Sequence, residues 1–425
     1  MTRKTAPAIK NAIDFNLELK PYEYFELSNG IPVYSVNAGA QEVIQMEMVF
    51  FAGNHFEKKT GIASATNYLL KNGTRTRTAF QVNEDFEYYG AYCNRSCYNE
   101  TAVVSLHSLT HHLPKVLPVM RDMLTESIFP ETELDIYKQN AQQRLKVNLL
   151  KCEFVAGRLI NQYLYGASHP YGRVSELNDI ENLQLADIRS FYEAYYLNGT
   201  CAIFIAGMLP QNLREMLNEQ FGNLNVGKPS FLTSDIPLSP SEEKKFRVTN
   251  DPDAVQGAIR IASPFPNRHH PHFKKAVVLN TIFGGFFGSR LMANIREEKG
   301  YTYGIYSYLQ NHIRQSAWVI STEAGKDVCD AAIAEVYKEM EALRNMPVKE
   351  EELLLVQNYL LGTVLGDLDG PFHIIAKWKN IILNSLDGSF FYDSIEAIKS
   401  VSAKELQELA NTYLHPEKFY ELVVY

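Results

Sequence analysis

Hydrophobic and polar residues alternate over short stretches of this chain and recur with helical spacing over longer ones. Residues 43–51 alternate as expected for a strand with one buried face. Residues 24–37 predict a hairpin, because Asn29-Gly30 is a favoured turn between two apolar runs. The same patterns predict two short strands within 91–106, a buried strand over 201–206, and helices over 60–70, 80–89, 113–127, 131–155, 155–165 and 185–195. Strands and helices therefore both contribute along the whole first half of the chain.

A change of composition marks a linker near the middle of the chain. Over 226–245, proline, serine and charged residues replace the periodic apolar ones. On either side of it a long helix is predicted directly after a proline step, at Pro130 and again at Pro347. We therefore expect an internal repeat, with an N-terminal domain over 1–225 and a similar C-terminal domain over 246–425, each of about 210 residues.

The composition is that of an ordinary globular protein. Of the 425 residues, 46% are hydrophobic and 21% are charged, which fits two or three domains with cores of their own. The net charge of −8 and the lack of a basic run argue against nucleic acid as a partner. The five cysteines are scattered and form no zinc cluster, so reduced, buried thiols are expected.

The opening residues carry positive charge without an apolar segment behind it, so they do not predict a secretory signal. No stretch of the sequence is long and apolar enough to cross a bilayer. We therefore expect a cytoplasmic protein with no membrane partner.

A glycine-rich loop opens the most specific segment of the sequence, residues 280–307. Gly284, Gly285 and Gly288 supply a backbone that can adopt positive φ and that lets another chain approach closely. Such a loop is a candidate for contact with a ligand.

A short helix, a turn and a strand follow this loop. Ser289 is a favourable N-cap for a helix over 290–299. Gly300 is placed to end that helix in the left-handed conformation. Residues 301–307 then alternate as a strand with one buried face.

Arg296 and Tyr303 stand on either side of that tight reversal, one in the last helical turn and the other in the strand. The reversal predicts that their side chains converge. A guanidinium and a phenol at one point suit a developing oxyanion, since both donate hydrogen bonds to negative charge. The alternative is that Arg296 is a surface charge at a helix end and Tyr303 is a core aromatic.

This segment resembles the C-terminal half of the insulinase-like (pitrilysin) zinc metallopeptidases, and specifically their mitochondrial-processing-peptidase branch. The shared pattern is Gly-Gly-x-x-x-Ser-Arg-Leu, then Ile-Arg, then Gly-x-x-Tyr. The resemblance implies an α+β fold of two similar domains, each a mostly antiparallel sheet packed with helices, facing each other across a cavity. It also implies that Arg296 and Tyr303 hold the substrate and stabilise the tetrahedral intermediate.

The zinc site that the resemblance implies is missing from the first half. Active members carry His-x-x-Glu-His on a helix, where the two histidines bind zinc and the glutamate is the general base. The flanks of that motif are present within 61–74, but Ser64, Asn67 and Tyr68 stand at the three positions. The third ligand is a glutamate on a later helix, and the matching stretch, 142–145, has no carboxylate. We therefore expect no metal and no cofactor in this chain.

Two groups of histidines are candidates for a substitute metal site. His107 and His111 have the spacing of a helical chelate, but they fall on a predicted strand-to-helix loop and lack an acidic base nearby. His269, His270 and His272 surround a proline before a helix, where a solvated turn is the preferred interpretation.

Loss of the zinc motif together with retention of Arg296 and Tyr303 predicts the non-zinc subunit of a heterodimeric metallopeptidase. The resemblance then implies a zinc-bearing homologous partner, which carries the metal, and a peptide substrate. The peptide is expected to add as a strand near Asn94 and to contact Gly284, Gly285 and Gly288.

Two alternatives stay open from the sequence. One is a catalytically inactive binding or assembly protein of the same fold, for which a homodimer in isolation is expected. The other is a free-standing peptidase with an unconventional metal site.

Overall fold

The computed structural model describes residues 10–229 and 236–425. Their contacts divide the chain into two compact units. One, the N-terminal unit, contains residues 20–242 together with 370–380, and the other, the C-terminal unit, contains 243–369 and 381–425 together with the described part of 1–19. Two short segments thus pack with the unit formed mainly by the other half of the sequence.

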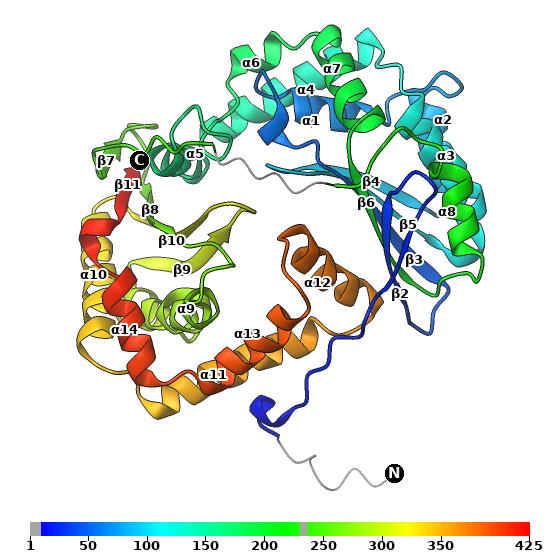
Figure 1. Ribbon diagram of the computed structural model, residues 1–425. Helices are drawn as coiled ribbons and strands as arrows, with labels where there is room; N and C mark the ends of the chain where they lie inside the picture. Colours follow the sequence, from blue (N-terminus) through cyan, green and yellow to red (C-terminus); the bar gives the residue numbers. More distant parts are fainter. Residues whose placement is uncertain (1–9, 230–235) are drawn as a thin grey trace, which may run out of the picture. The chain divides into compact units, whose positions relative to one another are not determined.

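The N-terminal unit is built on a six-stranded sheet with the order β1-β2-β6-β3-β5-β4 (Figure 1). Strands β2 and β6 run parallel and the other neighbours run antiparallel, so the sheet is mixed. The strands are β1 (Glu23–Glu26), β2 (Pro32–Asn37), β3 (Val43–Phe50), β4 (Tyr92–Cys97), β5 (Ala102–Leu109) and β6 (Cys201–Gly207). The hairpin predicted over 24–37 is confirmed, and Gly30 at its turn has φ +84°.

Most helices of this unit bury apolar side chains against the sheet. The helices up to residue 221 are α1 (Ile62–Leu69), α2 (Ala79–Tyr88), α3 (Leu113–Thr125), α4 (Glu131–Leu149), α5 (Cys152–Tyr165), α6 (Leu177–Glu181), α7 (Leu185–Tyr192) and α8 (Leu213–Phe221). The exceptions are α5 and α6, which pack on α4. The core between the layers contains Ile44, Met46 and Met48 from β3, each at most 1% exposed. This burial of apolar side chains is the main term that stabilises the unit.

The single helix predicted over 131–155 is wrong, because α4 ends at Leu149 and α5 begins at Cys152. Lys151 between them is extended, with φ −96° and ψ 118°, and its carbonyl accepts hydrogen bonds from the N–H groups of Phe154 and Val155. A new helix therefore starts there instead of the old one continuing.

Helix α12 (Pro371–Leu383) supplies the late segment of the N-terminal unit. Its Lys379 ammonium donates to the carboxylate of Glu47 on β3, and the indole N–H of Trp378 donates to the carbonyl of Lys20 at 2.8 Å. These contacts join residues more than three hundred positions apart.

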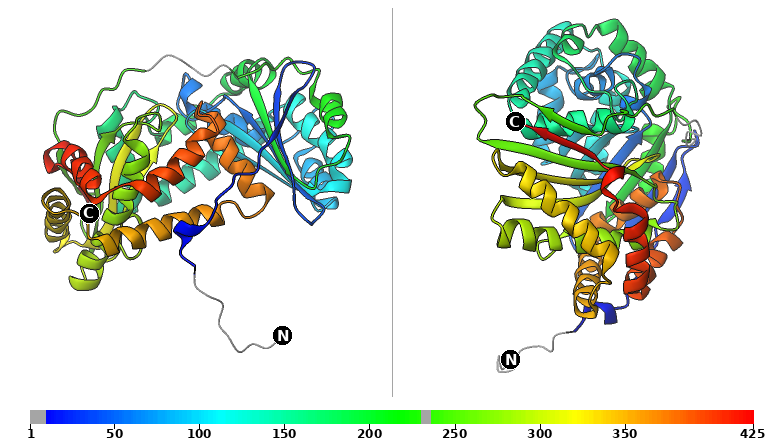
Figure 2. Two further views of the ribbon diagram at one scale, coloured as in Figure 1. Left: turned by 60° about the horizontal axis from the view of Figure 1, so that its bottom comes forward. Right: turned by 90° about the vertical axis from the view of Figure 1, so that its left-hand side faces the viewer.

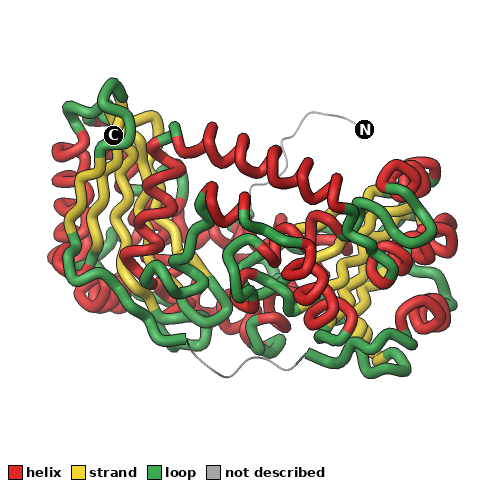
Figure 3. Tube along the Cα trace, turned by 90° about the horizontal axis from the view of Figure 1, so that it is seen from above, coloured by secondary structure: helices red, strands yellow, loops and turns green. Residues whose placement is uncertain are grey.

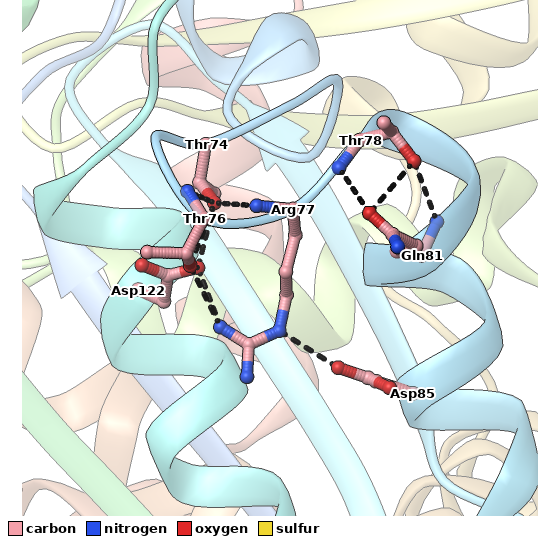
Figure 4. Close-up of polar contacts among 7 residues, drawn as sticks. All are labelled: Thr74, Thr76, Arg77, Thr78, Gln81, Asp85 and Asp122. Atoms are coloured by element: carbon pink, nitrogen blue, oxygen red, sulfur yellow. Dashed lines mark hydrogen bonds and ion pairs between the residues drawn. The ribbon is translucent and has the colours of Figure 1, made fainter.

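A polar cluster around Arg77 holds the loop before α2 against α3 (Figure 4). Arg77 donates from Nε to Asp85 and from Nη1 to Asp122, both at 2.7 Å. Burial opposes ionisation of Asp122, but hydrogen bonds from Thr74, Arg77 and Thr76 outweigh it and lower its pKa. Thr78 beside this cluster closes a capping box with Gln81 at the start of α2.

The C-terminal unit contains a five-stranded sheet with the order β7-β11-β8-β10-β9. Its strands are β7 (Lys245–Val248), β8 (Gln256–Phe265), β9 (Thr302–Asn311), β10 (Ser316–Gly325) and β11 (Tyr420–Val424). The last strand, red in Figure 2, inserts between β7 and β8, parallel to the first and antiparallel to the second. The helices of the C-terminal unit are α9 (Phe273–Asn280), α10 (Cys329–Asn345), α11 (Glu350–Gly366), α13 (Ser389–Ser400) and α14 (Ala403–Tyr413).

The two sheets repeat one topology. The order β2-β6-β3-β5-β4 of the first matches β7-β11-β8-β10-β9 of the second, with a parallel pair at the same place, and β1 is an addition. Figure 3 shows the strands gathered into these two sheets with helices packed on them. The predicted α+β class, with two similar sheet-and-helix domains, is confirmed.

Candidate functional site

Arg296 and Tyr303 lie on either side of the reversal from a helix into strand β9. The helix contains Arg290 and Leu291 and continues as a π-helix over Met292–Glu298. Gly300 follows with φ +68°, as predicted, and allows the tight reversal that a side chain would strain. Across it, Nε of Arg296 donates to the carbonyl oxygen of Tyr303 at 3.0 Å.

Both residues line one open cavity of about 720 Å³. Tyr303 is 93% exposed, so the alternative that it is a core aromatic is wrong. The lining residues are Gln256, Arg296, Glu297, Gly300, Tyr301, Thr302, Tyr303, Glu323 and Gly325. Because the contact between the two residues is made by the Tyr303 main-chain carbonyl and not by its phenol, the predicted convergence of the two side chains stays a prediction.

The guanidinium of Arg296 is fixed from two further sides. Its Cζ lies 4.6 Å from the ring centroid of Phe287, a cation–π contact. Its Nη1 lies 3.4 Å from Oε1 of Glu297. Among the residues that the structure describes, Nη2 of Arg296 has no hydrogen-bond partner, so it stays available to a ligand.

The predicted glycines lie outside this cavity. Gly284 is buried in a π-helical turn (Thr281–Gly285), and a Cβ added there would come within 2.6 Å of the Cβ of Ser307 on β9. Close packing of this turn on β9 therefore explains why a residue without a side chain stands at position 284. Gly285 and Gly288 are exposed, and their predicted contact with substrate stays a prediction.

Ser289 departs from its predicted role. The helix does begin at Arg290, but the Ser289 hydroxyl is buried and has no hydrogen-bond partner within the described residues. Only its main-chain carbonyl contributes, accepting from the N–H of Ala293 at 2.9 Å. The expected side-chain cap is wrong because the hydroxyl is enclosed by neighbouring atoms instead of facing a free N–H.

The residues that replace the zinc motif lie on α1 and make contacts of their own. Asn67 is 2% exposed and donates from Nδ2 to the hydroxyl of Tyr196 at 3.1 Å. The hydroxyl of Ser64 donates to Oδ1 of Asn54 at 3.4 Å. The ring of Tyr68 lies 5.1 Å from that of Tyr137 on α4. None of these groups is a zinc ligand of ordinary strength at neutral pH.

A buried carboxylate fixes the start of α1. Oε2 of Glu57 accepts from the N–H groups of Gly61 and Ala63 at 3.1 and 3.0 Å, and its Oε1 lies 3.1 Å from Nη2 of Arg173. Burial raises the pKa of Glu57 against the opposing effect of these partners. Glu57 therefore serves the helix end and not a metal.

Arg95 on β4 stands beside this helix, and sequence reasoning missed it. Its guanidinium lies over the ring of Tyr68, with Cζ 5.1 Å from the centroid. Its Nη1 donates to the carbonyl of Tyr68 and to Oδ1 of Asn72, the latter at 3.3 Å. Burial lowers the pKa of Arg95. The signal that could have found it is a lone arginine on the strand next to Asn94.

A cation beside the former ligand positions does not fit zinc, since like charges repel. On α4, Gln142 donates to the carbonyl of Leu177 at 3.4 Å, and Arg144 is exposed. Within residues 10–229 and 236–425, no group of three His, Cys, Asp or Glu side chains is placed to hold a metal ion. The residues present therefore do not fit the family's metal.

Asn94 occupies an edge strand. β4 pairs only with β5, where Asn94 faces Ser105, and its other side is unpaired in the sheet order. Asn94 is exposed, so the strand could accept an added peptide strand there. That role for Asn94 stays a prediction.

The predicted loop position is wrong for His107, which lies on β5, where its Nδ1 is buried without a hydrogen-bond partner among the described residues. His111 lies in the turn after this strand, 3.6 Å from a carboxylate oxygen of Glu42. His269 Nε2 is 2.8 Å from the carbonyl of Asn384. These contacts favour the structural interpretation of both groups.

The comparisons with known proteins identify the family. Two units of mixed sheet and helix, one with an Arg–Tyr cavity and the other with an altered helix in place of a zinc motif, define a peptidase-like protein. The family described as "Insulinase (Peptidase family M16)" matches residues 33–166, and the one described as "Peptidase M16 inactive domain" matches residues 182–360. The chain belongs to the M16 insulinase family.

Individual relatives agree with this assignment. A Bacillus subtilis protein named "Uncharacterized zinc protease YmxG" is 21% identical over 349 residues, covering 81% of this chain and 84% of the relative. The crystal structure of a peptidase M16 inactive domain from Pseudomonas fluorescens matches with a TM-score of 0.84 and 22% identity, covering 95% of this chain and 98% of that one. A chain of Complex III2 from Candida albicans matches with a TM-score of 0.73 and 14% identity, covering 94% of each.

None of the described helices combines the length and the apolar character needed to span a membrane.

Proposed function

We propose that this protein is the non-zinc subunit of a two-chain metallopeptidase. It would supply Arg296 and Tyr303 to a peptide held by a zinc-bearing homologous partner. The observation that carries the proposal is that these two residues line one cavity while Ser64, Asn67 and Tyr68 stand where zinc ligands and base would be needed. The expected compartment, the cytoplasm, is part of this proposal.

The chemistry would be divided between the chains. The partner's zinc would polarise the scissile carbonyl and activate water. In this chain, Nη2 of Arg296 and the phenol of Tyr303 would donate hydrogen bonds to the oxygen on which negative charge develops. The bond from Arg296 to the Tyr303 carbonyl holds the guanidinium in place before substrate arrives, which lowers the cost of ordering it.

Reconstitution tests this proposal. The chain is mixed with a homologue from the same organism that carries an intact His-x-x-Glu-His motif, and cleavage of a fluorogenic peptide is followed. We expect no cleavage by this chain alone and cleavage by the pair that a chelator abolishes. Arg296→Ala should lower kcat of the pair by about a hundredfold, as removal of an oxyanion donor does. Full activity of a pair containing this variant would refute the catalytic role.

The second candidate is a catalytically inactive binding or assembly protein of the same fold. The likeness in fold to a chain of Complex III2 favours it, since that chain is part of a complex. A stable homodimer that no zinc-bearing homologue can displace would support this candidate over the first.

A further inference from the structure

Arg95 is a half-buried cation with no carboxylate within ion-pair distance in the described part of the chain. Its Nη1 donates hydrogen bonds to the carbonyl oxygen of Tyr68 and to Oδ1 of Asn72. Its Nε is buried and has no hydrogen-bond partner, and no bond from Nη2 is found among the described residues. The unsatisfied donors therefore lie together on one edge of the guanidinium.

A second cation, Lys71, lies near Arg95. Its Nζ donates to the carbonyl of Cys93 at 3.3 Å and stands 5.3 Å from the ring centroid of Phe86. It forms no ion pair with the described residues, and the charge of Arg95 adds to burial in lowering its pKa. Two positive charges thus share one end of β4.

The nearest acids do not neutralise this pair of cations. Glu133 accepts a hydrogen bond from Nδ2 of Asn72 at 2.7 Å and so reaches Arg95 only through that amide. Glu87 acts on Lys71 from beyond ion-pair distance. A partly buried cation without a counter-ion lowers the stability of the folded state, and an anion bound there would offset that cost.

Two aromatic rings lie beside the guanidinium of Arg95. The ring of Tyr68 covers one face of the guanidinium, and the ring of Tyr137 packs beside Tyr68. Apolar walls reduce the screening of charge by water and strengthen a charged hydrogen bond. The free edge of an arginine, Nε with Nη2, matches the two oxygens of a carboxylate, which it can hold by paired hydrogen bonds.

We propose that Arg95 and Lys71 form a carboxylate-binding site beside Tyr68 of α1. The ligand class is a peptide that presents a carboxylate, either at its C-terminus or on an acidic side chain. The proposal concerns the N-terminal unit alone and does not depend on a zinc-bearing partner.

Calorimetric titration of the full chain with three short peptides tests the proposal. The probes are N-acetyl-trialanine with a free C-terminus, its C-terminal amide, and the amidated peptide acetyl-Ala-Glu-Ala. We expect at least one of the two acidic probes to bind at least tenfold more tightly than the neutral amide. Which of the two binds identifies the terminal or the side-chain carboxylate as the source. Equal affinity for all three, or no binding of either acidic probe at millimolar concentration, would overturn the proposal.

Substitutions assign the effect to Arg95. Arg95→Gln should weaken binding of the acidic probe at least tenfold, and Arg95→Lys should restore part of it. Arg75→Gln is the matched control, because Arg75 is exposed and already paired with Glu126, and it should bind as wild type. Retention of full affinity by Arg95→Gln would contradict the assignment. If that variant fails to fold, the comparison of acid and amide on the wild type still decides.

Discussion

Arg296 and Tyr303 are joined by a hydrogen bond from the guanidinium Nε to the Tyr303 carbonyl at 3.0 Å, while the Tyr303 ring itself projects into solvent. The bond fixes the arginine through the main chain, so it does not depend on the phenol. The two side chains can therefore be altered separately.

Tyr303→Phe and Arg296→Lys should affect a reconstituted peptidase without unfolding the chain. Tyr303 is 93% exposed and its hydroxyl makes no bond within the described residues, so removing that oxygen should leave the melting temperature unchanged. Because one donor to the developing oxyanion is lost, kcat should fall at least tenfold while KM changes little. Arg296→Lys should lower kcat in the same way. A lysine ammonium cannot donate to the Tyr303 carbonyl and to the ligand at once, as the planar guanidinium can.

Lys299→Ala is the control for these kinetics, because Lys299 ends the same helix but does not line the cavity and pairs with exposed Glu298. Steady-state rates of the three variants with one partner preparation give the comparison. A loss with Lys299→Ala equal to that with Arg296→Lys would mean that the helix end, and not the guanidinium, matters.

The Arg77 cluster should contribute measurably to the stability of the N-terminal unit. Asp122→Ala leaves the partly buried guanidinium of Arg77 and the hydroxyls of Thr74 and Thr76 without their common acceptor. Loss of a charged, partly buried partner costs about 1–3 kcal/mol, which should appear as a lower midpoint of urea unfolding.

Arg75→Ala is the matched control for that experiment. Its pair with Glu126 is exposed, with side chains 78% and 40% accessible, and exposed pairs contribute only about 0–1 kcal/mol. Equal shifts of the urea midpoint for Asp122→Ala and Arg75→Ala would show that the Arg77 cluster stabilises the unit no more than a surface ion pair does.

Stability of the C-terminal unit should depend on pH through Glu405. This carboxylate accepts a hydrogen bond from Nζ of Lys275 at 2.5 Å and forms a capping box with Ser402 at the start of α14. Lys275, followed by the bonds from Ser402, lowers the pKa of Glu405 from 4.5 to about 2. Because the folded-state pKa lies below the unfolded one, the contribution is present above pH 4.5 and is lost as the pH falls toward 2.

Glu405→Gln should therefore be less stable than wild type by about 1 kcal/mol at pH 7 and should approach it near pH 3. Both side chains of the ion pair are 37% exposed, so solvent screening keeps the effect this small. Trp318, 1% exposed in this unit, reports unfolding by fluorescence. Glu408→Gln is the control. It removes an exposed ion pair with Lys404 at 3.9 Å and should leave the free energy of unfolding unchanged at either pH. A pH-independent loss for Glu405→Gln would contradict the linkage.

The thiols of buried Cys93 and half-buried Cys97 should resist alkylation. Burial raises their pKa values to about 11 and about 12, so almost no thiolate is present at pH 8. Mass spectrometry after treatment with iodoacetamide should find partly exposed Cys152 modified first and these two only after urea is added. Native-state modification of Cys97 at the rate of a free thiol would show that its surroundings open.

Local sequence predicted the features that depend on neighbouring residues. The left-handed Gly300, strand β9 and the approach of Arg296 to Tyr303 all follow from one short reversal. The same holds for the hairpin at Gly30, where two favourable residues decide the turn.

Features that depend on distant segments could not be read in this way. Arg95 meets Tyr68 only because β4 lies beside α1, and Lys379 joins Glu47 across 332 positions. At Ser289 the local sequence predicted a side-chain cap, but the hydroxyl is buried and caps no N–H group of the helix. The reversal that brings Arg296 close to the Tyr303 carbonyl on the C-terminal unit was therefore predictable, whereas the position of Arg95 beside Tyr68 was not.

The most direct measurement is a titration of a fixed amount of the zinc-bearing homologue with increasing amounts of this chain, with the rate of peptide cleavage as the readout. The account predicts a low rate at the start that rises and levels off at one copy of this chain per partner, with no rise for Arg296→Ala. A rate that does not respond to this chain, or metal-dependent cleavage by this chain alone, would contradict it.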